Sequence, residues 1–151
     1  MKPTQLRNEL IKPVLTKIGL YSQLAEDLLV GTCCAESLCG EYIKQVNGPA
    51  CGIFQMEPNT ARDIIDNFLK FKVQLKAKID NLYCTNMSLE ENLTYNMAYQ
   101  VAMCRIHYYR VKEALPTTRE GCAKYWKKYY NTELGKGTVE EFLSKWKKIE
   151  G

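Results

Sequence analysis

A glutamate at the end of an apolar helix is the first candidate for chemistry in this sequence. Residues 22–39 have helical apolar spacing, and Glu36 shares a face with Ala25, Leu29, Thr32 and Cys33. A carboxyl beside an apolar face is desolvated, which favours its neutral form. A glycosidase acid needs that condition, because it must still hold a proton near neutral pH. Glu36 is therefore a candidate general acid; the alternative is a boundary glutamate that pairs with a lysine.

The residues that follow Glu36 carry a recognisable pattern. Glu36-Ser37 is followed by the segment GPACGIFQMEPNTA at 48–61. This arrangement resembles the core signature of lytic transglycosylases and goose-type lysozymes, a Glu-Ser pair and then Gly-Ala-x-Gly-Leu-Met-Gln-x-x-Pro-x-Thr-Ala. The resemblance covers residues 31–64; the gap is one residue longer here, and Pro49 is inserted in the Gly-Ala step.

The resemblance implies cleavage of the β-1,4 link between N-acetylmuramic acid and N-acetylglucosamine, with Glu36 as the catalytic acid. It implies that Ser37 orients the site and contributes to substrate binding. The substrate-binding edge of the cleft then falls on Gly52, Ile53, Phe54 and Gln55. Glycine permits close approach of the backbone, and the glutamine amide offers a donor and an acceptor to an N-acetyl sugar.

A second, weaker match lies near the C-terminus. It resembles the family segment Ala-Tyr-Asn-Ala-Gly-Pro-Gly-x-Val through Tyr130, Asn131, Gly135, Gly137 and Val139. Two extra residues precede the first glycine, and Tyr129 replaces the first alanine. The resemblance implies that Tyr130 approaches the catalytic carboxylate and that Asn131 binds substrate, whereas core packing is the competing role for the tyrosine. The same choice, sugar stacking or core packing, applies to Tyr125, Trp126 and Tyr129.

The second carboxylate of an ordinary glycosidase is harder to place. Such enzymes use two acidic groups about 5–9.5 Å apart. Sequence position offers Glu41, Glu57, Asp63 and Asp66. Lytic transglycosylases need one acid/base, because a hydroxyl of the sugar itself closes on the anomeric carbon. The matched segment lacks a strong second acid, which favours that route, but Glu57 beside the glycine-glutamine edge leaves hydrolysis open.

Helices must position these residues, and their start signals are visible. Helices are predicted over about 4–17, 22–39, 58–70, 88–115, 117–130 and 138–149. Ser22 is a plausible N-cap, Pro13 interrupts the first helix, and Pro58 suits a first helical turn. Capping boxes pair Ser88 with Glu91, Thr117 with Glu120, and Thr138 with Glu141.

Residues 40–56 interrupt this helical pattern with Gly40, Asn47, Gly48, Pro49 and Gly52. The predicted fold is therefore mainly α, an α+β lysozyme-like domain with a small β or loop insert at about 40–56. The 151 residues fit one domain, 1–151, with one core.

Net charge and cysteine content limit the classes of binding partner and cofactor to be expected. The net charge of +4 suits an anionic partner such as bacterial peptidoglycan glycan strands, but it is too small to indicate nucleic acid. Seven cysteines form no CxxC pair, and His107 is the one histidine, so neither a metal site nor another cofactor is expected. His107 itself is predicted to be packed or exposed, not catalytic. The cysteines are expected to be reduced thiols, with a disulfide framework as the alternative.

The N-terminus has no apolar run long enough for a signal peptide, and no stretch suggests membrane insertion. We therefore expect synthesis in a host cytoplasm and action at the bacterial cell wall. The segment YWKKYYNT at 125–132 resembles phage-encoded members of the lysozyme-like superfamily, which implies release through membrane lesions or carriage in a virion. A different class stays open: a catalytically silent phage structural protein that keeps the fold and contacts virion proteins.

Overall fold

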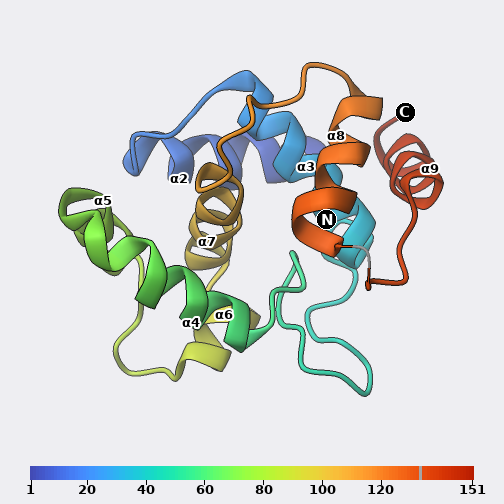
Figure 1. The fold of residues 1–151 in the computed structure, drawn as a ribbon. Coiled ribbons are helices and arrows are strands. Elements are labelled where there is room, and N and C mark those ends of the chain that lie inside the picture. The colour runs from blue at the N-terminus through green and yellow to red at the C-terminus, as the bar shows by residue number, and fades with distance from the viewer. Residues whose placement is uncertain (133) are drawn as a thin grey trace.

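Helices make up most of the chain, as predicted, in a computed structural model that describes residues 1–132 and 134–151 (Figure 1). The α-helices are α1 Pro3–Gln5, α2 Lys12–Lys17, α3 Gln23–Ser37, α4 Pro58–Asn67, α5 Val73–Asp80, α6 Leu89–Tyr95, α7 Met97–Tyr109, α8 Arg119–Trp126 and α9 Val139–Glu150. Two wider π-helical turns, η1 Leu6–Ile11 and η3 Lys127–Asn131, and a 3₁₀ turn, η2 Leu69–Phe71, extend them.

The central element is α7, around which the other helices are arranged (Figure 1). All residues from Tyr99 to Ile106 are buried, and a helix that is buried all round must lie inside its domain. Contacts link α7 to α2, α3, α4, α5 and α6. The core is therefore built on this helix, and the candidate acid lies on its neighbour α3.

The helix α3 begins and ends as its sequence predicts. The Ser22 hydroxyl accepts a hydrogen bond from the amide of Ala25, which confirms Ser22 as the N-cap. At the other end Leu38 has φ of 52°, and the Cys39 amide donates to the Cys33 carbonyl at 3.1 Å. α9 lies very close to α3, since a Cβ added at Gly31 would stand 2.6 Å from Cζ of Phe142.

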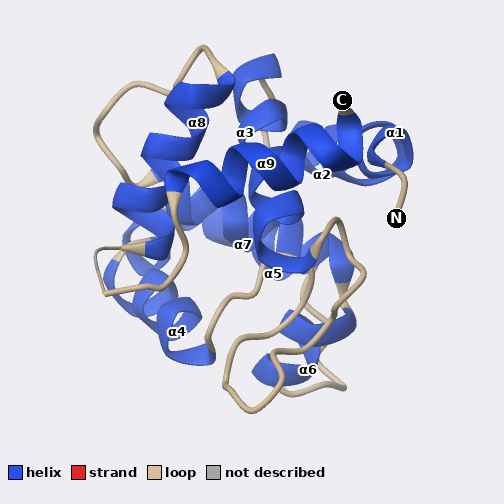
Figure 2. Ribbon diagram, turned by 90° about the vertical axis from the view of Figure 1, so that its right-hand side faces the viewer, coloured by secondary structure: helices blue, strands red, loops and turns tan. Residues whose placement is uncertain are grey.

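The predicted insert at 40–56 is a packed loop. Within the described residues it contains no extended strand, and two isolated bridges, Lys44 with Cys51 and Cys51 with Met56, hold it together (Figure 2). Its second half is nonetheless part of the core, because Ile53 and Phe54 are buried. The insert therefore adds a rigid turn beside the end of α3.

The structure corrects the helix predicted over 88–115. The capping box of Ser88 and Glu91 is confirmed. However, the chain leaves the helical conformation at Asn96, whose ψ is 89°, and restarts as α7 with Asn96 as its N-cap. α7 then ends at Tyr109. An asparagine side chain can cap a new helix inside an otherwise helical pattern, which explains the break.

Other boundaries differ by less. Thr138 caps α9 as predicted, whereas α8 is capped by Thr118 and not by Thr117. Pro13 does not interrupt the first helix. The π turn η1 precedes α2, and Pro13 occupies the first turn of α2. The sequence reasoning missed η2 and α5. None of the helices in the described part of the chain is long and apolar enough to cross a lipid bilayer.

Candidate functional site

Glu36 lies on the last turn of α3, where its carboxylate meets α8. The indole Nε1 of Trp126 donates a hydrogen bond to Oε2 of Glu36 at 2.8 Å. Burial raises the pKa of Glu36 to about 7, while the bond from Trp126 and the positive charge of Lys145 act in the opposite direction. At neutral pH a large fraction of Glu36 therefore keeps its proton, which is what general acid catalysis requires.

Glu36 opens onto a cleft of about 470 Å³, which we call the acid cleft. Its walls come from the end of α3, the insert, η3, the following loop and α9. The lining residues are Ala35, Glu36, Gln45, Trp126, Asn131, Leu134, Gly135, Lys136, Gly137, Glu141, Phe142 and Lys145. Glu36 is thus largely buried and yet has access from outside the protein.

Asn131 is the one residue of the predicted binding set, besides Glu36 itself, that lines the acid cleft. Its Oδ1 accepts a hydrogen bond from Nζ of Lys127 at 2.7 Å. The backbone of Gly137 lies close to the Trp126 ring, because a Cβ added at Gly137 would stand 2.6 Å from that ring. Gly137 therefore lets the loop approach Trp126, while Gly135 lies against Asn131.

Ser37 faces away from the acid cleft and holds the insert against α3. Its side chain is buried, and its hydroxyl donates to the carbonyl of Ile53 at 2.6 Å and accepts from the amide of Gly40 at 2.8 Å. The resemblance implied that Ser37 touches substrate. In this structure it shapes the site from behind, because both of its hydrogen-bonding directions are used by the insert.

The predicted substrate edge at Gly52, Ile53 and Phe54 is not exposed to a ligand. All three are buried. Gly52 has φ of 79°, and a Cβ there would stand 2.1 Å from the carbonyl oxygen of Leu93. The close approach that this glycine allows is therefore to the backbone of α6.

The backbone groups of this edge are used by the protein. The amide of Ile53 donates to Oε1 of Gln100 at 2.9 Å, and the carbonyl of Phe54 accepts from the hydroxyl of Tyr130 at 2.6 Å. Because both groups have hydrogen-bond partners inside the protein, they are not available to bind a ligand in this conformation. The segment 52–54 acts as the scaffold of the site.

Gln55 lines a second cleft of about 360 Å³, together with Glu57, His107 and Tyr130. Its Nε2 donates to the carbonyl of Gly52 at 2.8 Å, and its backbone φ is 50°. The amide therefore bonds the insert, while the side chain remains partly exposed in the second cleft. The geometry therefore does not favour the prediction that the Gln55 amide binds the sugar.

Tyr130 is also in the second cleft, and in the described part of the chain no hydrogen bond joins it to Glu36. Its ring stacks on Tyr108 at 5.3 Å and meets His107 edge-on at 5.0 Å. Burial raises the pKa of Tyr130 well above the usual range, and the nearby charge of Glu36 adds to the rise. Tyr130 is therefore near the acid but bonded to the insert, and Trp126 makes the direct contact.

The second carboxylate predicted at Glu57 lies in the second cleft, together with Asp63, and not beside Glu36. Among the described residues the acid cleft has one further carboxyl, that of the exposed Glu141 in the first turn of α9. Glu141 accepts from Thr138 as part of the helix cap. No described group of three or more histidine, cysteine, aspartate or glutamate side chains is placed to hold a metal ion.

His107 behaves as a packed residue, in agreement with the sequence reasoning. Burial and the charge of Arg110 lower its pKa to about 4, so it is neutral at physiological pH. Sequence reasoning did not identify Trp126 or Lys145 as partners of Glu36.

Comparison of the chain with protein-family models, with curated proteins and with solved structures gives no match. The chemistry of the site therefore rests on its own residues. Those residues are a carboxyl with a raised pKa, an indole that orients it, and a cleft with two lysines and two amide side chains.

Proposed function

We propose that this protein cleaves the β-1,4 link between N-acetylmuramic acid and N-acetylglucosamine in bacterial peptidoglycan, with Glu36 as the general acid. The observation that carries the proposal is the Glu36 carboxyl, which opens onto the acid cleft and has a pKa raised to about 7. The similarity of residues 31–64 to lytic transglycosylases and goose-type lysozymes supports the same chemistry.

In this mechanism Glu36 transfers its proton to the glycosidic oxygen as the bond to the anomeric carbon breaks. Trp126 keeps the carboxyl in place through its bond to Oε2, which leaves the other oxygen to face the substrate. Gln45 and Asn131 also line the acid cleft; their amide oxygens accept internal hydrogen bonds, so their amide nitrogens are the groups that can donate to the acetamido oxygens of the glycan. Lys136 and Lys145 give the cleft positive charge, which suits a carboxylate-bearing polymer.

The second half of the reaction follows from the position of the acids. Glu57 is in the second cleft, and Glu141 is exposed and bound in a helix cap. We therefore favour the intramolecular route, in which a hydroxyl of the cleaved sugar attacks the anomeric carbon. The Glu36 carboxylate then takes up the proton of that hydroxyl and returns to its starting state. Water in place of the sugar hydroxyl would give ordinary hydrolysis.

A second candidate is a virion structural protein that keeps this architecture without turnover. The observation that favours it is the internal use of Ser37 and of segment 52–54, whose polar groups stabilise the insert. Retention of these residues is then explained by folding alone. The partly exposed Glu36, whose pKa is raised to about 7, favours the enzyme, because its carboxyl also opens onto the acid cleft.

Mass analysis of products from purified cell-wall glycan separates these cases. Products with anhydro ends support the intramolecular route, and products with reducing ends support hydrolysis. Intact glycan over prolonged incubation, with a protein shown to be folded by circular dichroism, rules out the enzyme and leaves the structural candidate.

A further inference from the structure

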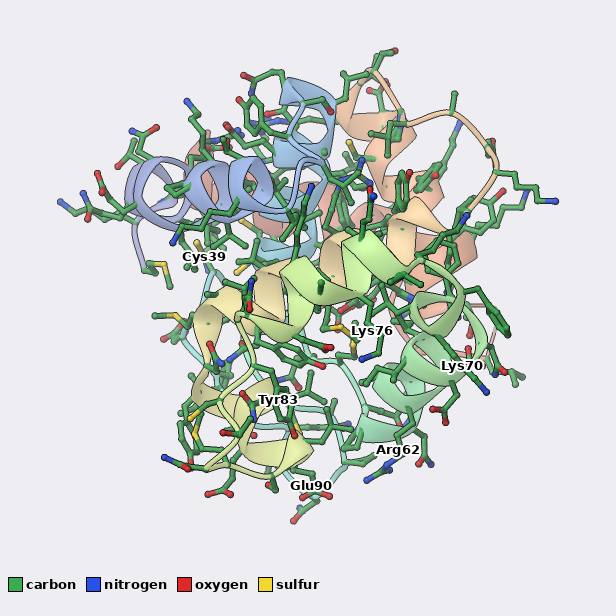
Figure 3. All side chains as sticks on the ribbon, turned by 90° about the vertical axis from the view of Figure 1, so that its left-hand side faces the viewer. Cys39, Arg62, Lys70, Lys76, Tyr83 and Glu90 are labelled. Atoms are coloured by element: carbon green, nitrogen blue, oxygen red, sulfur yellow. The ribbon has the colours of Figure 1, made fainter. Side chains whose placement is uncertain are left out.

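A strongly basic segment lies at the edge of the molecule formed by η2 and α5. Residues 69–79 contain four lysines, at positions 70, 72, 76 and 78, and no acidic residue. Figure 3 labels Lys70 and Lys76 on this face. In Figure 1, α5 lies at the left edge and α9 at the right, so this segment is remote from the acid cleft.

Two apolar side chains stand exposed among these lysines. Phe71 is 69% exposed and Val73 is 77% exposed. Their neighbour in the chain, Leu69, supplies the contact with the core and is buried. Next to Val73 a shallow groove, lined also by Leu75 and Tyr109, continues the apolar surface. We call Lys70, Phe71, Lys72 and Val73 the basic tip.

The charges of the basic tip are not neutralised by the rest of the protein. Lys76 forms an ion pair with Asp80 at 2.6 Å, but in the described part of the chain no ion pair includes Lys70, Lys72 or Lys78. The nearby acid Asp63 is bound by Arg110 at 2.7 Å. Lys70 and Lys72 thus alternate with the two exposed apolar side chains along the chain, whereas the ammonium of Lys78 lies beside Gly19.

We propose that the basic tip docks this protein onto an anionic phospholipid surface without crossing it. Phe71 and Val73 enter the boundary between headgroups and acyl chains, and Lys70 and Lys72 contact lipid phosphates. A nucleic acid fits less well, because Val73 has no ring to stack on a base and phosphate contacts leave it exposed. A bilayer surface accommodates both the charges and the aliphatic group.

The test uses co-sedimentation of the full chain with vesicles of equal parts phosphatidylglycerol and phosphatidylcholine, and with pure phosphatidylcholine vesicles. We expect binding to the anionic vesicles and little to the neutral ones. The variant Lys70→Gln/Lys72→Gln should bind on the order of 25-fold more weakly, because each lysine near such a surface is worth about 1 kcal/mol, or about fivefold. The double variant Phe71→Ser/Val73→Ser should lose about tenfold.

Matched controls separate a docking site from general charge attraction. The variant Lys124→Gln/Lys147→Gln/Lys148→Gln removes one charge more than the tip variant, from exposed positions elsewhere, and it should bind as the wild type does. Phe71→Trp should keep the affinity, and its fluorescence should shift to the blue and be quenched by brominated lipid. Because the substituted positions are exposed, melting temperatures should stay close to the wild-type value.

Three results would overturn the proposal. The first is no binding to anionic vesicles at low salt. The second is equal loss in the control triple variant, which would indicate net charge alone. The third is binding that does not change in Phe71→Ser/Val73→Ser, since a site for nucleic acid phosphates or any purely ionic partner would behave in that way.

Discussion

The indole of Trp126 and the carboxyl of Glu36, 90 residues apart in the chain, share a 2.8 Å hydrogen bond. The bond joins the last turn of α3 to the end of α8. Burial raises the pKa of Glu36 to about 7, and the Trp126 bond restrains that rise because it stabilises the ionised form. This pair sets both the geometry and the protonation of the candidate acid.

Replacement of the acid should stop the proposed reaction. Glu36→Gln removes the transferable proton, so glycan cleavage should fall by a factor on the order of 10²–10⁴. Turnover of purified cell-wall glycan measures the loss. Glu57→Gln, in the second cleft, is the matched control and should keep most activity. Full activity in Glu36→Gln would remove this residue from the mechanism.

The same substitution should change the dependence of stability on pH. The folded-state pKa of Glu36 is raised from 4.5 to about 7, so the folded protein binds this proton more tightly than the unfolded chain. Stability is therefore lost as pH rises from about 4.5 to 7, by up to about 3 kcal/mol.

Glu36→Gln cannot ionise, so it should be more stable than the wild type at pH 8 and much closer to it at pH 5. Urea unfolding at both pH values measures this difference. His107 titrates in both proteins and its contribution cancels in the comparison. If the two proteins differ equally at both pH values, the pKa of Glu36 is not raised.

Loss of the indole donor should move the pH profile of activity. Trp126→Phe removes the bond that lowers the pKa of Glu36, so the alkaline decline in kcat/KM should shift to higher pH. Trp146→Phe is the control: Trp146 is also buried and also donates to a glutamate, Glu150, at 2.8 Å. A shift of similar size in both variants would show that packing, and not the hydrogen bond, is responsible.

Gln55 should matter more for stability than for sugar affinity. Gln55→Ala deletes the bond to the Gly52 carbonyl and should cost about 1 kcal/mol in the free energy of unfolding. Gln55→Gly loses the same bond, but glycine adopts the φ of 50° without strain, so it should be less destabilised. Thermal melts together with chito-oligosaccharide titrations test this; weakened sugar binding in a variant of unchanged stability would restore Gln55 as a substrate ligand.

All seven cysteines should titrate as free thiols after denaturation without reductant. The structure has them as thiols, six of them buried, and the odd number prevents complete pairing. Cys33 and Cys39 are the pair best placed to form a disulfide, because the backbone hydrogen bond at the end of α3 brings them together. A thiol count that rises on addition of reductant would mean that a disulfide exists and that the folding compartment is oxidising.

Local sequence was sufficient for the features that depend on neighbours in the chain. Ser22, Ser88 and Thr138 cap helices as predicted, because the hydroxyl and the amide that it binds are three residues apart. The position of Glu36 on the last turn of a buried helix follows from apolar spacing. The break at residues 40–56 follows from glycine and proline.

The tertiary structure decided which atoms meet across long separations. Sequence could not show that Trp126 binds Glu36, since that contact depends on the docking of α8 against α3. It also could not show that Gly52 packs against Leu93 and that Ile53 is paired with Gln100, which turns an expected substrate edge into scaffold. A hydrogen bond between distant segments is selected by the global packing of helices, and no local spacing rule encodes that choice.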